Sequence, residues 1–130
     1  MGEAEWDVVV IGAGPGGGSA ALHCARLGLN TLILEEHEQI GIPVHCGECL
    51  SEVAVQNLDL KLPEEVISLH VKGIRVLFPN NIEKTLTEPG YVLEKHLFEE
   101  WLINEAVKEG ATFKASHKVR SLSKKFKLEN

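Results

Sequence analysis

The segment that decides the fold is Asp7–Ala21, which reads DVVVIGAGPGGGSAA. An aspartate and four β-branched residues open it, and such a run is typical of a strand buried on both faces in a parallel sheet. A glycine-rich turn follows without a spacer, and Ser19–Leu27 then shows the small-residue face of a helix that Gly28 would end. A second apolar run, Asn30–Glu36, predicts the next strand. Together these segments predict a βαβ unit over residues 6–36.

The glycine-rich turn fits the pattern G-x-G-x-x-G, and its context makes the match specific. It follows a strand, opens a helix and precedes a strand that ends in an acid, as a dinucleotide-binding site requires. Gly12 would permit the tight turn, Gly14 would let a pyrophosphate approach the backbone, and Gly17 would let the helix pack on the strand. Free N–H groups at the helix N-terminus would face the phosphates. The candidate cofactor-binding residues of the turn are Gly12, Gly14, Pro15, Gly16 and Gly17.

The acid at the end of the second strand would bind the ribose of the cofactor. We assign this role to Glu35, the last residue of the expected strand, and keep Glu36 as the alternative ligand. A carboxylate at this position favours a free ribose 2′-hydroxyl, and therefore FAD or NAD over NADP.

The remainder of the chain favours FAD over NAD, because an NAD dehydrogenase would normally place another crossover helix directly after the second strand. We expect instead a functional loop over 37–51, an antiparallel insertion over 68–93 in which 70–78 pairs with 82–88, an amphipathic helix over 95–109 and a third parallel strand over 111–119. This layout resembles the Rossmann-like FAD-binding domains of the glutathione-reductase and hydroxybenzoate-hydroxylase type. The resemblance implies a three-layer α/β fold with a parallel sheet.

Length and composition indicate one compact domain. The chain has 130 residues, 44% of them hydrophobic, and a net charge of −6, which argues against general nucleic-acid binding. Basic residues gather near the end of the chain, and we interpret them as a solvated strand edge rather than a nucleic-acid or lipid site. They are Lys118, Arg120, Lys124, Lys125 and Lys127.

The cysteine count and the length of the apolar runs indicate the cellular compartment and the extent of membrane contact. Three cysteines form no disulfide framework, which indicates a reducing, intracellular environment. The N-terminus lacks the basic region of a signal peptide, and the longest apolar runs are too short to span a bilayer. We therefore expect a cytoplasmic protein with at most peripheral membrane contact.

Two further motifs point to a family. Pro43–Cys49 reads PVHCGEC, and Tyr91–Glu99 reads YVLEKHLFE. With the glycine-rich segment they resemble the geranylgeranyl reductases, nearest to the archaeal digeranylgeranylglycerophospholipid reductases, whose motifs are P-x-x-C-G-E-G and Y-V-L-x-R-x-x-F-D. The resemblance implies an FAD enzyme that saturates the prenyl double bonds of isoprenoid ether lipids, in which the flavin carries the chemistry.

The resemblance also implies cofactor contacts for Cys46, Gly47 and Cys49, which would lie along the FAD, and for Lys95, which stands where the family has an arginine. Lysine keeps the charge of arginine but lacks its planar fork. Cys49 stands where the family has a glycine, and a cysteine is costly there if the backbone needs a positive φ or a close approach to the flavin. No catalytic residue can be named from the sequence.

Members of this family are several hundred residues long. We therefore expect an N-terminal portion of an FAD-binding domain, without the second flavin-binding segment and the substrate domain. Its incomplete sheet would allow a second copy or a partner chain to associate. Whether this chain alone is an enzyme stays open. The alternatives are a flavoprotein dehydrogenase that passes electrons to a quinone or an electron-transfer flavoprotein, and a non-catalytic nucleotide-binding fragment that works with a partner.

The spacing Cys46-x-x-Cys49 allows other interpretations. A structural zinc site needs four ligands, and besides His45 only His37 is near in sequence, so we predict no metal site. A thioredoxin-like dithiol normally opens a helix directly after a strand, whereas this pair lies in a Gly/Pro loop. A disulfide that faces the flavin stays open as a rival, since thiols and flavins exchange electrons.

Overall fold

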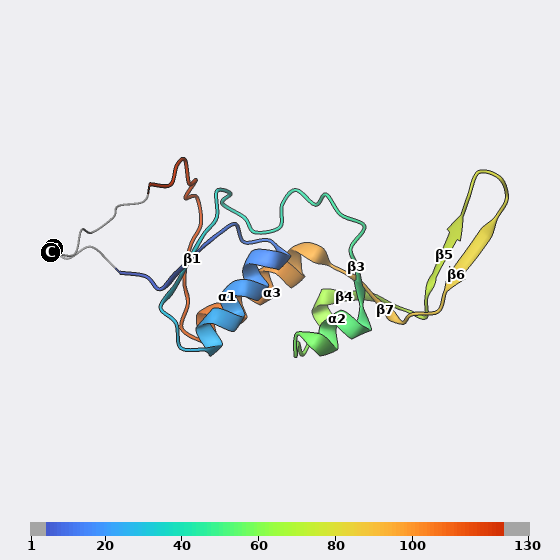
Figure 1. Ribbon diagram of the computed structural model, residues 1–130, viewed down its shortest axis with the longest axis horizontal. Helices are drawn as coiled ribbons and strands as arrows, with labels where there is room; N and C mark the ends of the chain where they lie inside the picture. Colours follow the sequence, from blue (N-terminus) through green and yellow to red (C-terminus); the bar gives the residue numbers. More distant parts are fainter. Residues whose placement is uncertain (1–4, 124–130) are drawn as a thin grey trace, which may run out of the picture.

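Residues 5–123 are described by a computed structural model, in which a parallel sheet carries two helices and is followed by an antiparallel sheet and a projecting hairpin (Figure 1). The parallel sheet has the strand order β1-β2-β8, with strands Val8–Ile11, Thr31–Leu34 and Thr112–Lys114. Both pairs are parallel and continuous in register. The third parallel strand that the sequence predicts after the last helix is present, and it pairs with β2.

The strand β8 is shorter than the predicted range of 111–119. It ends at Lys114, and the chain then turns through Ser116, which has a φ of 57°. The N–H of Ser116 donates to the carbonyl of His37 at 3.1 Å, and the N–H of His117 donates to the carbonyl of Glu35 at 2.7 Å. These bonds tie the segment after β8 to the segment after β2, so both strand ends meet at one edge of the sheet.

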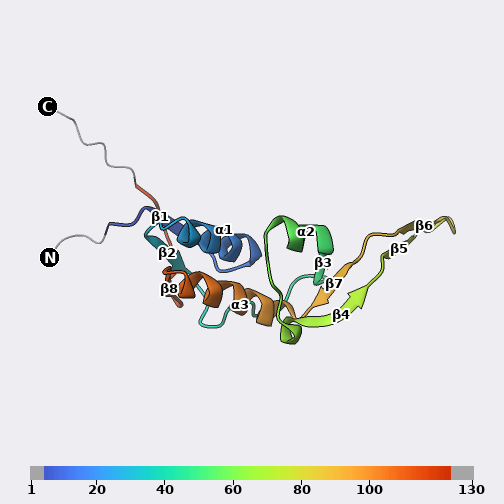
Figure 2. The same cartoon turned by 90° about the horizontal axis from the view of Figure 1, so that it is seen from below.

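One face of the parallel sheet is covered by two helices that pack on each other, α1 (Pro15–Arg26) and α3 (Lys95–Lys108) (Figure 2). Gly18 allows the close approach, because a Cβ on it would lie 3.0 Å from the Cβ of Leu102. The sheet and the two helices share one hydrophobic core, and its fully buried large side chains include Leu22, Ile33, Leu102 and Ile103. The glycine-rich turn leads into α1, so the packing of α1 on α3 and on the sheet fixes the position of the turn.

The opposite face of β1 is uncovered. Val9 is 47% exposed and Ile11 is 52% exposed. In the described part of the chain β1 also lies at the edge of its sheet, since it pairs with β2 alone. The second covering layer of the predicted three-layer arrangement is thus missing from residues 5–123, and the parallel part of the fold prediction is confirmed.

The antiparallel sheet has the order β3-β7-β4, with strands Cys49–Ser51, Gly90–Leu93 and Ile67–Val71. A short helix α2 (Glu52–Asn57) and a 3₁₀ turn η1 (Glu64–Val66) connect the first of these strands to the last. The hydroxyl of Ser51 caps α2 by accepting the N–H of Ala54 at 3.2 Å. The strand β7 leads directly into α3, so this sheet fixes where α3 begins.

The pairing predicted between 70–78 and 82–88 is only partly correct. The first segment divides: His70 belongs to β4, which pairs with β7, while β5 (Ile74–Leu77) forms a separate hairpin with β6 (Glu83–Leu86). Gly73 explains the division, because a Cβ on it would lie 2.3 Å from the carbonyl oxygen of Leu86. Only glycine allows the two hairpin strands to converge there.

The molecule is elongated, with the β5–β6 hairpin at one end and β1 toward the other (Figure 1). Among residues 5–123 no helix is both long and apolar enough to cross a bilayer. Three of the basic residues noted in the sequence, Lys124, Lys125 and Lys127, lie outside the described residues.

Candidate cofactor-binding site

The glycine-rich turn has the geometry that its sequence predicts. Gly12 has a φ of 98°, and its N–H donates to the carbonyl of Leu34 at 2.8 Å, which ties the turn to β2. A Cβ on Gly17 would lie 2.0 Å from the carbonyl oxygen of Gly12. Gly12 is therefore needed for the turn and Gly17 for the contact between helix and strand.

The N-terminus of α1 is open toward solvent and toward the loop after β2. Gly14 is the N-cap residue, Pro15 is the first helical residue, and no side chain caps the helix. The atom nearest to a Cβ built on Gly14 is Glu99 Oε1, at 3.9 Å, and a Cβ on Gly16 would have no neighbour within 4 Å. The first turn contains no acidic residue. Its N–H groups therefore remain available to an anionic group.

Glu35 is buried at the end of β2 and is held against the turn. Its Oε2 accepts the N–H of Ala13 at 2.7 Å. Its Oε1 accepts the N–H of His37 at 2.9 Å and lies 2.6 Å from His37 Nδ1. Burial acts to raise the pKa of Glu35, but these hydrogen bonds and the charge of His37 outweigh it, so the pKa lies below its ordinary value. Glu35 is thus a preoriented, ionised acceptor beside the turn.

Glu36 has a different partner from Glu35. It is exposed, and its Oε2 pairs with Nζ of Lys118, on the segment that follows β8. The hydrogen bond and the charge of Lys118 hold the pKa of Glu36 below its ordinary value. Of the two acids considered for the ribose, Glu35 is the one that the structure ties to the glycine-rich turn.

Lys95 and Glu99 form an ion pair on the first turn of α3. Nζ of Lys95 bonds Oε1 of Glu99, and their side chains are 19% and 3% exposed. Glu99 is also close to the loop after β2, since a Cβ on Gly41 would lie 2.7 Å from Glu99 Oε2. Gly41 has a φ of 74°. The pair therefore lies between the open end of α1 and the loop, which places Lys95 in the same cavity lining as Gly14 and Glu35.

Glu48 joins the loop to the start of α3, and its carboxylate was not among the predicted site residues. Its φ is 62°, its carbonyl accepts the N–H of Leu93 at 2.8 Å, and its Oε1 accepts the N–H of Lys95 at 3.2 Å. The carboxylate thus satisfies one of the free N–H groups at the N-terminus of α3. The loop that carries the two cysteines is fixed to α3 through this residue.

The two loop cysteines are exposed and free. Cys49 opens β3 opposite Val92, and its Sγ donates to the carbonyl of Gly47 at 3.3 Å. The N–H of Glu48 donates to Sγ of Cys46 at 3.4 Å. Within residues 5–123 no group of three or more His, Cys, Asp and Glu side chains is arranged to hold a metal ion. Both thiols therefore engage their own loop.

The glycine-rich turn, the loop after β2 and the first turn of α3 enclose a cavity of about 400 Å³. It is open to solvent, and its lining includes three carboxylates and the ammonium group of Lys95, which is paired with Glu99. The lining residues are Ala13, Gly14, Glu35, Glu36, His37, Gly41, Ile42, Pro43, His45, Lys95 and Glu99. Four predicted cofactor contacts, Gly14, Glu35, Glu36 and Lys95, thus line one cavity. Cys46 and Gly47 lie farther along the same loop, and Cys49 is the first residue of β3; none of the three lines this cavity.

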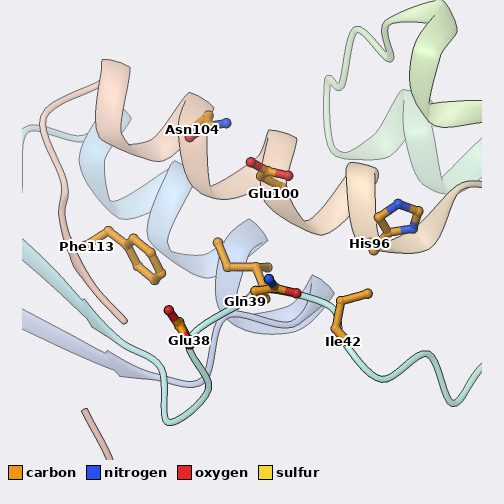
Figure 3. Close-up of a pocket in the computed structure, with 8 residues that line it drawn as sticks. Glu38, Gln39, Ile42, His96, Glu100, Asn104 and Phe113 are labelled. Atoms are coloured by element: carbon orange, nitrogen blue, oxygen red, sulfur yellow. The ribbon is translucent and has the colours of Figure 1, made fainter. Parts of the chain in front are cut away.

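A second cavity of about 470 Å³ lies between residues 38–42, α3 and β8 (Figure 3). Glu38 and Gln39 extend from the loop toward Glu100 and Asn104 on α3. The glycine-rich turn does not line this space, so the free N–H groups at the start of α1 cannot bind a pyrophosphate there. The first cavity is the one suited to an anionic nucleotide.

Sequence reasoning missed residues that shape the site through their backbone or through partners far along the chain. The N–H of Ala13 orients Glu35, and Gly41 makes room for Glu99. Glu99 has two sequence signals: it ends the motif Tyr91–Glu99, where the family has an aspartate, and it lies four residues after Lys95, which allows an ion pair on one helix face. Glu48 is the glutamate of the motif Pro43–Cys49, but its partner is 47 residues away, so the sequence did not show the bond that it makes.

Comparison with known proteins agrees with this geometry. A family model of FAD-dependent oxidoreductases matches residues 7–68. Digeranylgeranylglycerophospholipid reductase of Thermoplasma acidophilum is 42% identical over 113 residues, which are 82% of this chain and 28% of that protein. The chain therefore spans less than a third of the length of this relative.

Solved structures give the same result. A geranylgeranyl bacteriochlorophyll reductase-like protein from Thermoplasma acidophilum superposes with a TM-score of 0.80 at 39% identity, over 85% of this chain and 30% of the other. A triple mutant of a flavin-dependent brominase superposes with a TM-score of 0.73 at 28% identity, with the same coverage of both chains. From its sequence, its glycine-rich turn and these similarities, the chain belongs to the geranylgeranyl reductase family of FAD-dependent oxidoreductases.

Proposed function

We propose that the cavity at the N-terminus of α1 binds FAD, and that the whole protein reduces prenyl double bonds of an isoprenoid lipid. The observation that supports FAD most directly is the placement of Glu35. Its ionised carboxylate is held by the N–H of Ala13, directly beside an open helix N-terminus that no side chain caps. A ribose whose hydroxyls donate to Glu35 and a pyrophosphate whose oxygens accept the N–H groups of the helix N-terminus match this pair of neighbours.

Each residue would then hold one part of the cofactor. Glu35 would accept the ribose hydroxyls, and the N–H groups at the start of α1 would bind the pyrophosphate. Lys95 would contact the phosphates as a point charge, because it lacks the fork of an arginine. The loop over 37–51 would lie along the flavin through Cys46, Gly47 and Cys49. Bound flavin supplies hydride equivalents for the saturation of an alkene.

The lipid substrate is inferred from the relatives. The name of the Thermoplasma acidophilum relative describes reduction of a digeranylgeranyl phospholipid. The brominase shares the fold and has a different chemistry in its title, so the fold alone does not select the substrate. A substrate with long prenyl chains would favour contact with a membrane surface, and we propose that such contact is peripheral.

A glycine series tests the cofactor site without disturbing the fold. A Cβ at position 47 would have no neighbour within 4 Å, and one at position 14 would meet its first atom at 3.9 Å. Gly14→Ala and Gly47→Ala should therefore fold normally, and a loss of FAD binding would report the approach of the ligand. Gly28→Ala is the control: Gly28 lies beyond the other end of α1, and its φ of 78° makes the substitution mildly destabilising, so this variant shows whether a small loss of stability by itself weakens FAD binding.

FAD binding is measured by flavin absorption and by titration of purified protein. We expect the wild-type chain and Gly28→Ala to bind FAD, and the two site variants to bind at least about tenfold more weakly, a change of about 1.4 kcal/mol. A wild-type chain that binds no FAD would sink the proposal. Normal binding by both site variants would place the cofactor elsewhere on the molecule.

Cys49 offers a second test along the loop. Its thiol donates to the carbonyl of Gly47 and faces solvent. Cys49→Gly and Cys49→Ser should retain or increase FAD affinity if the cysteine only occupies space near the flavin. A change in a redox midpoint, or a loss of bound metal, would instead assign the cysteine a chemical role.

A further inference from the structure

The ring of His37 bonds the carboxylate that the proposed function assigns to the ribose. Nδ1 of His37 lies 2.6 Å from Oε1 of Glu35, and the two side chains are 57% and 11% exposed. Both residues line the cavity at the N-terminus of α1. The ring and an incoming ribose would therefore use the same wall of this cavity.

The carboxylate of Glu35 has few acceptor positions left. An ionised carboxylate has about four lone-pair positions, two on each oxygen, and it can only accept hydrogen bonds. Oε2 accepts the N–H of Ala13 at 2.7 Å. Oε1 accepts the N–H of His37 at 2.9 Å and also the proton of the ring Nδ1. Both positions on Oε1 are thus occupied, and the one position left is on Oε2.

This occupancy limits how a ribose can bind. The 2′- and 3′-hydroxyls are neighbours, and a carboxylate binds both when each of its oxygens accepts one of them. While the ring of His37 is bonded to Glu35, Oε1 has no position for a hydroxyl. A single hydroxyl can then be accepted, through Oε2.

The ring is not needed to orient the carboxylate. The backbone N–H groups of Ala13 and His37 already hold one oxygen each, and they remain whatever side chain stands at position 37. The main chain of His37 is itself fixed, because its carbonyl accepts the N–H of Ser116 at 3.1 Å. A substitution at position 37 should therefore remove the ring bond and leave the other contacts of Glu35 in place.

A ribose hydroxyl has little to gain by displacing the ring. Burial acts to raise the pKa of Glu35, but the N–H groups of His37 and Ala13 and the ring of His37 lower it below its ordinary value. The carboxylate is therefore ionised at neutral pH, and its hydrogen bonds are of the stronger, charge-assisted kind. A hydroxyl that replaced the ring would exchange one such bond for another.

We propose that His37 is a specificity-determining residue of this site: its ring occupies Oε1 of Glu35, so that the carboxylate accepts only one hydroxyl of the ribose. The inference rests on the proposed binding of FAD in this cavity, and it adds how many ribose hydroxyls the site recognises. Removal of the ring should make the site both tighter for FAD and more selective for a complete ribose.

Three substitutions separate the ring bond from other effects. His37→Leu removes the donor and keeps a bulky side chain at an exposed position. His37→Asn keeps a donor, because the amide nitrogen of asparagine is as many bonds from the backbone as the ring Nδ1. His23→Leu is the control: Nδ1 of His23 lies 2.8 Å from the carbonyl of Ser19 within α1, and His23 does not line the cavity.

The binding experiment titrates each purified chain with FAD and with two FAD analogues, which contain 2′-deoxyadenosine or 3′-deoxyadenosine. We expect His37→Leu to bind FAD about tenfold more tightly than the wild type, because Oε1 gains a hydroxyl. His37→Asn and His23→Leu should bind FAD as the wild type does. The wild type should bind only one of the two analogues more weakly than FAD, whereas His37→Leu should bind both more weakly.

The outcomes distinguish this proposal from the binding of FAD itself. The proposal alone is overturned if the wild type binds FAD and His37→Leu binds it no more tightly, or if the wild type loses the same affinity for both analogues. If none of the four proteins binds FAD, the proposed function fails and this inference fails with it.

A second measurement needs no cofactor. An NMR titration of the Glu35 carboxyl in the FAD-free chain should give a higher pKa for Glu35 in His37→Leu than in the wild type, because the hydrogen bond and the charge of the ring are lost. His37→Asn should raise this pKa less, since its amide still donates. An unchanged pKa in His37→Leu would mean that the ring does not bond Glu35 in solution, and it would overturn the proposal.

Discussion

Gly41 lies against the buried carboxylate of Glu99, so close that a Cβ on Gly41 would stand 2.7 Å from Glu99 Oε2. The same Cβ would stand 2.7 Å from the Cα of His96, which cannot move without displacing α3. The loop after β2 therefore contacts α3 through a position that admits only glycine.

The first prediction concerns this contact. Gly41→Ala should lower the free energy of unfolding by more than Gly28→Ala, because both glycines have a similar positive φ, 74° and 78°, and only Gly41 has neighbours. We expect about 1 kcal/mol for Gly28→Ala from the backbone alone, and about 2–3 kcal/mol for Gly41→Ala. Urea unfolding measures both. Equal losses would show that the loop is not held against α3.

The second prediction concerns the ion pair of Lys95 with Glu99. Lys95→Met leaves a carboxylate that is 3% exposed without its cation, and breaking such a pair costs about 3–5 kcal/mol. The double variant Lys95→Met/Glu99→Leu should recover most of this loss. Lys108→Met is the control, because its pair with Glu105 is on the surface and is worth less than about 1 kcal/mol. A Lys95→Met variant as stable as Lys108→Met would contradict the burial of the pair.

A third prediction separates two neighbouring glycines of the turn. Gly17→Ala should destabilise the fold strongly, since its Cβ would overlap the carbonyl oxygen of Gly12, whereas Gly16→Ala meets nothing within 4 Å. Gly16 is helical, so alanine there should be neutral or stabilising by about 0.5–1 kcal/mol. Thermal unfolding of the two variants checks this order, and a stable Gly17→Ala variant would mean that α1 sits farther from β1.

Glu48 supports the fourth prediction. Glu48→Ala should cost about 1 kcal/mol, because it removes the acceptor for the N–H of Lys95 at the start of α3. Glu48→Gln keeps an acceptor oxygen and should lose less. Ser51→Ala, which removes the cap of α2, is a control for capping away from α3. Hydrogen exchange at the first turn of α3 distinguishes them, since only the Glu48 variants should increase it.

The fifth prediction is a pH dependence of Glu35. Its folded-state pKa lies below the ordinary value of 4.5, so the ionised form favours the folded state. The stability from this group is fully present above about pH 4.5 and is lost as the pH falls through the folded-state pKa. Glu35→Gln should therefore reduce the fall in the free energy of unfolding that the wild type shows as the pH is lowered below about 4.5. Glu38→Gln, at an exposed position, should leave that fall unchanged, and equal curves for wild type and Glu35→Gln would refute the assignment.

The sequence predicted the parallel part of the fold because the signals there are local. A β-branched run, a glycine turn and a helix follow one another within 30 residues, and their order fixes β1, α1 and β2. The pairing of β8 with β2 also followed, because a crossover helix returns the chain to a parallel sheet. The separation of β4 from β5 did not, since it depends on the contact of Gly73 with Leu86.

The site could be predicted at positions where only one type of residue can serve the function. The glycines of the turn and the acid after the second strand stand at such positions. Glu48 and Glu99 belong to the two family motifs, but their contacts were not predictable, because a glutamate in a helix or loop is usually solvated and only packing shows that Glu99 is buried and that Glu48 caps a helix. The second face of β1 has no covering layer within residues 5–123, which the β-branched run alone did not indicate.

The pairing of Lys95 with Glu99 also affects how a dianionic cofactor would reach the site. The cation is neutralised by a carboxylate of its own helix, and the whole chain has a net charge of −6, so no long-range field draws the ligand in. Attraction begins only within hydrogen-bonding distance of the α1 N–H groups. Repulsion between the negatively charged chain and the dianion should slow association, and added salt should speed it by screening this repulsion, so tight binding would have to come from slow dissociation.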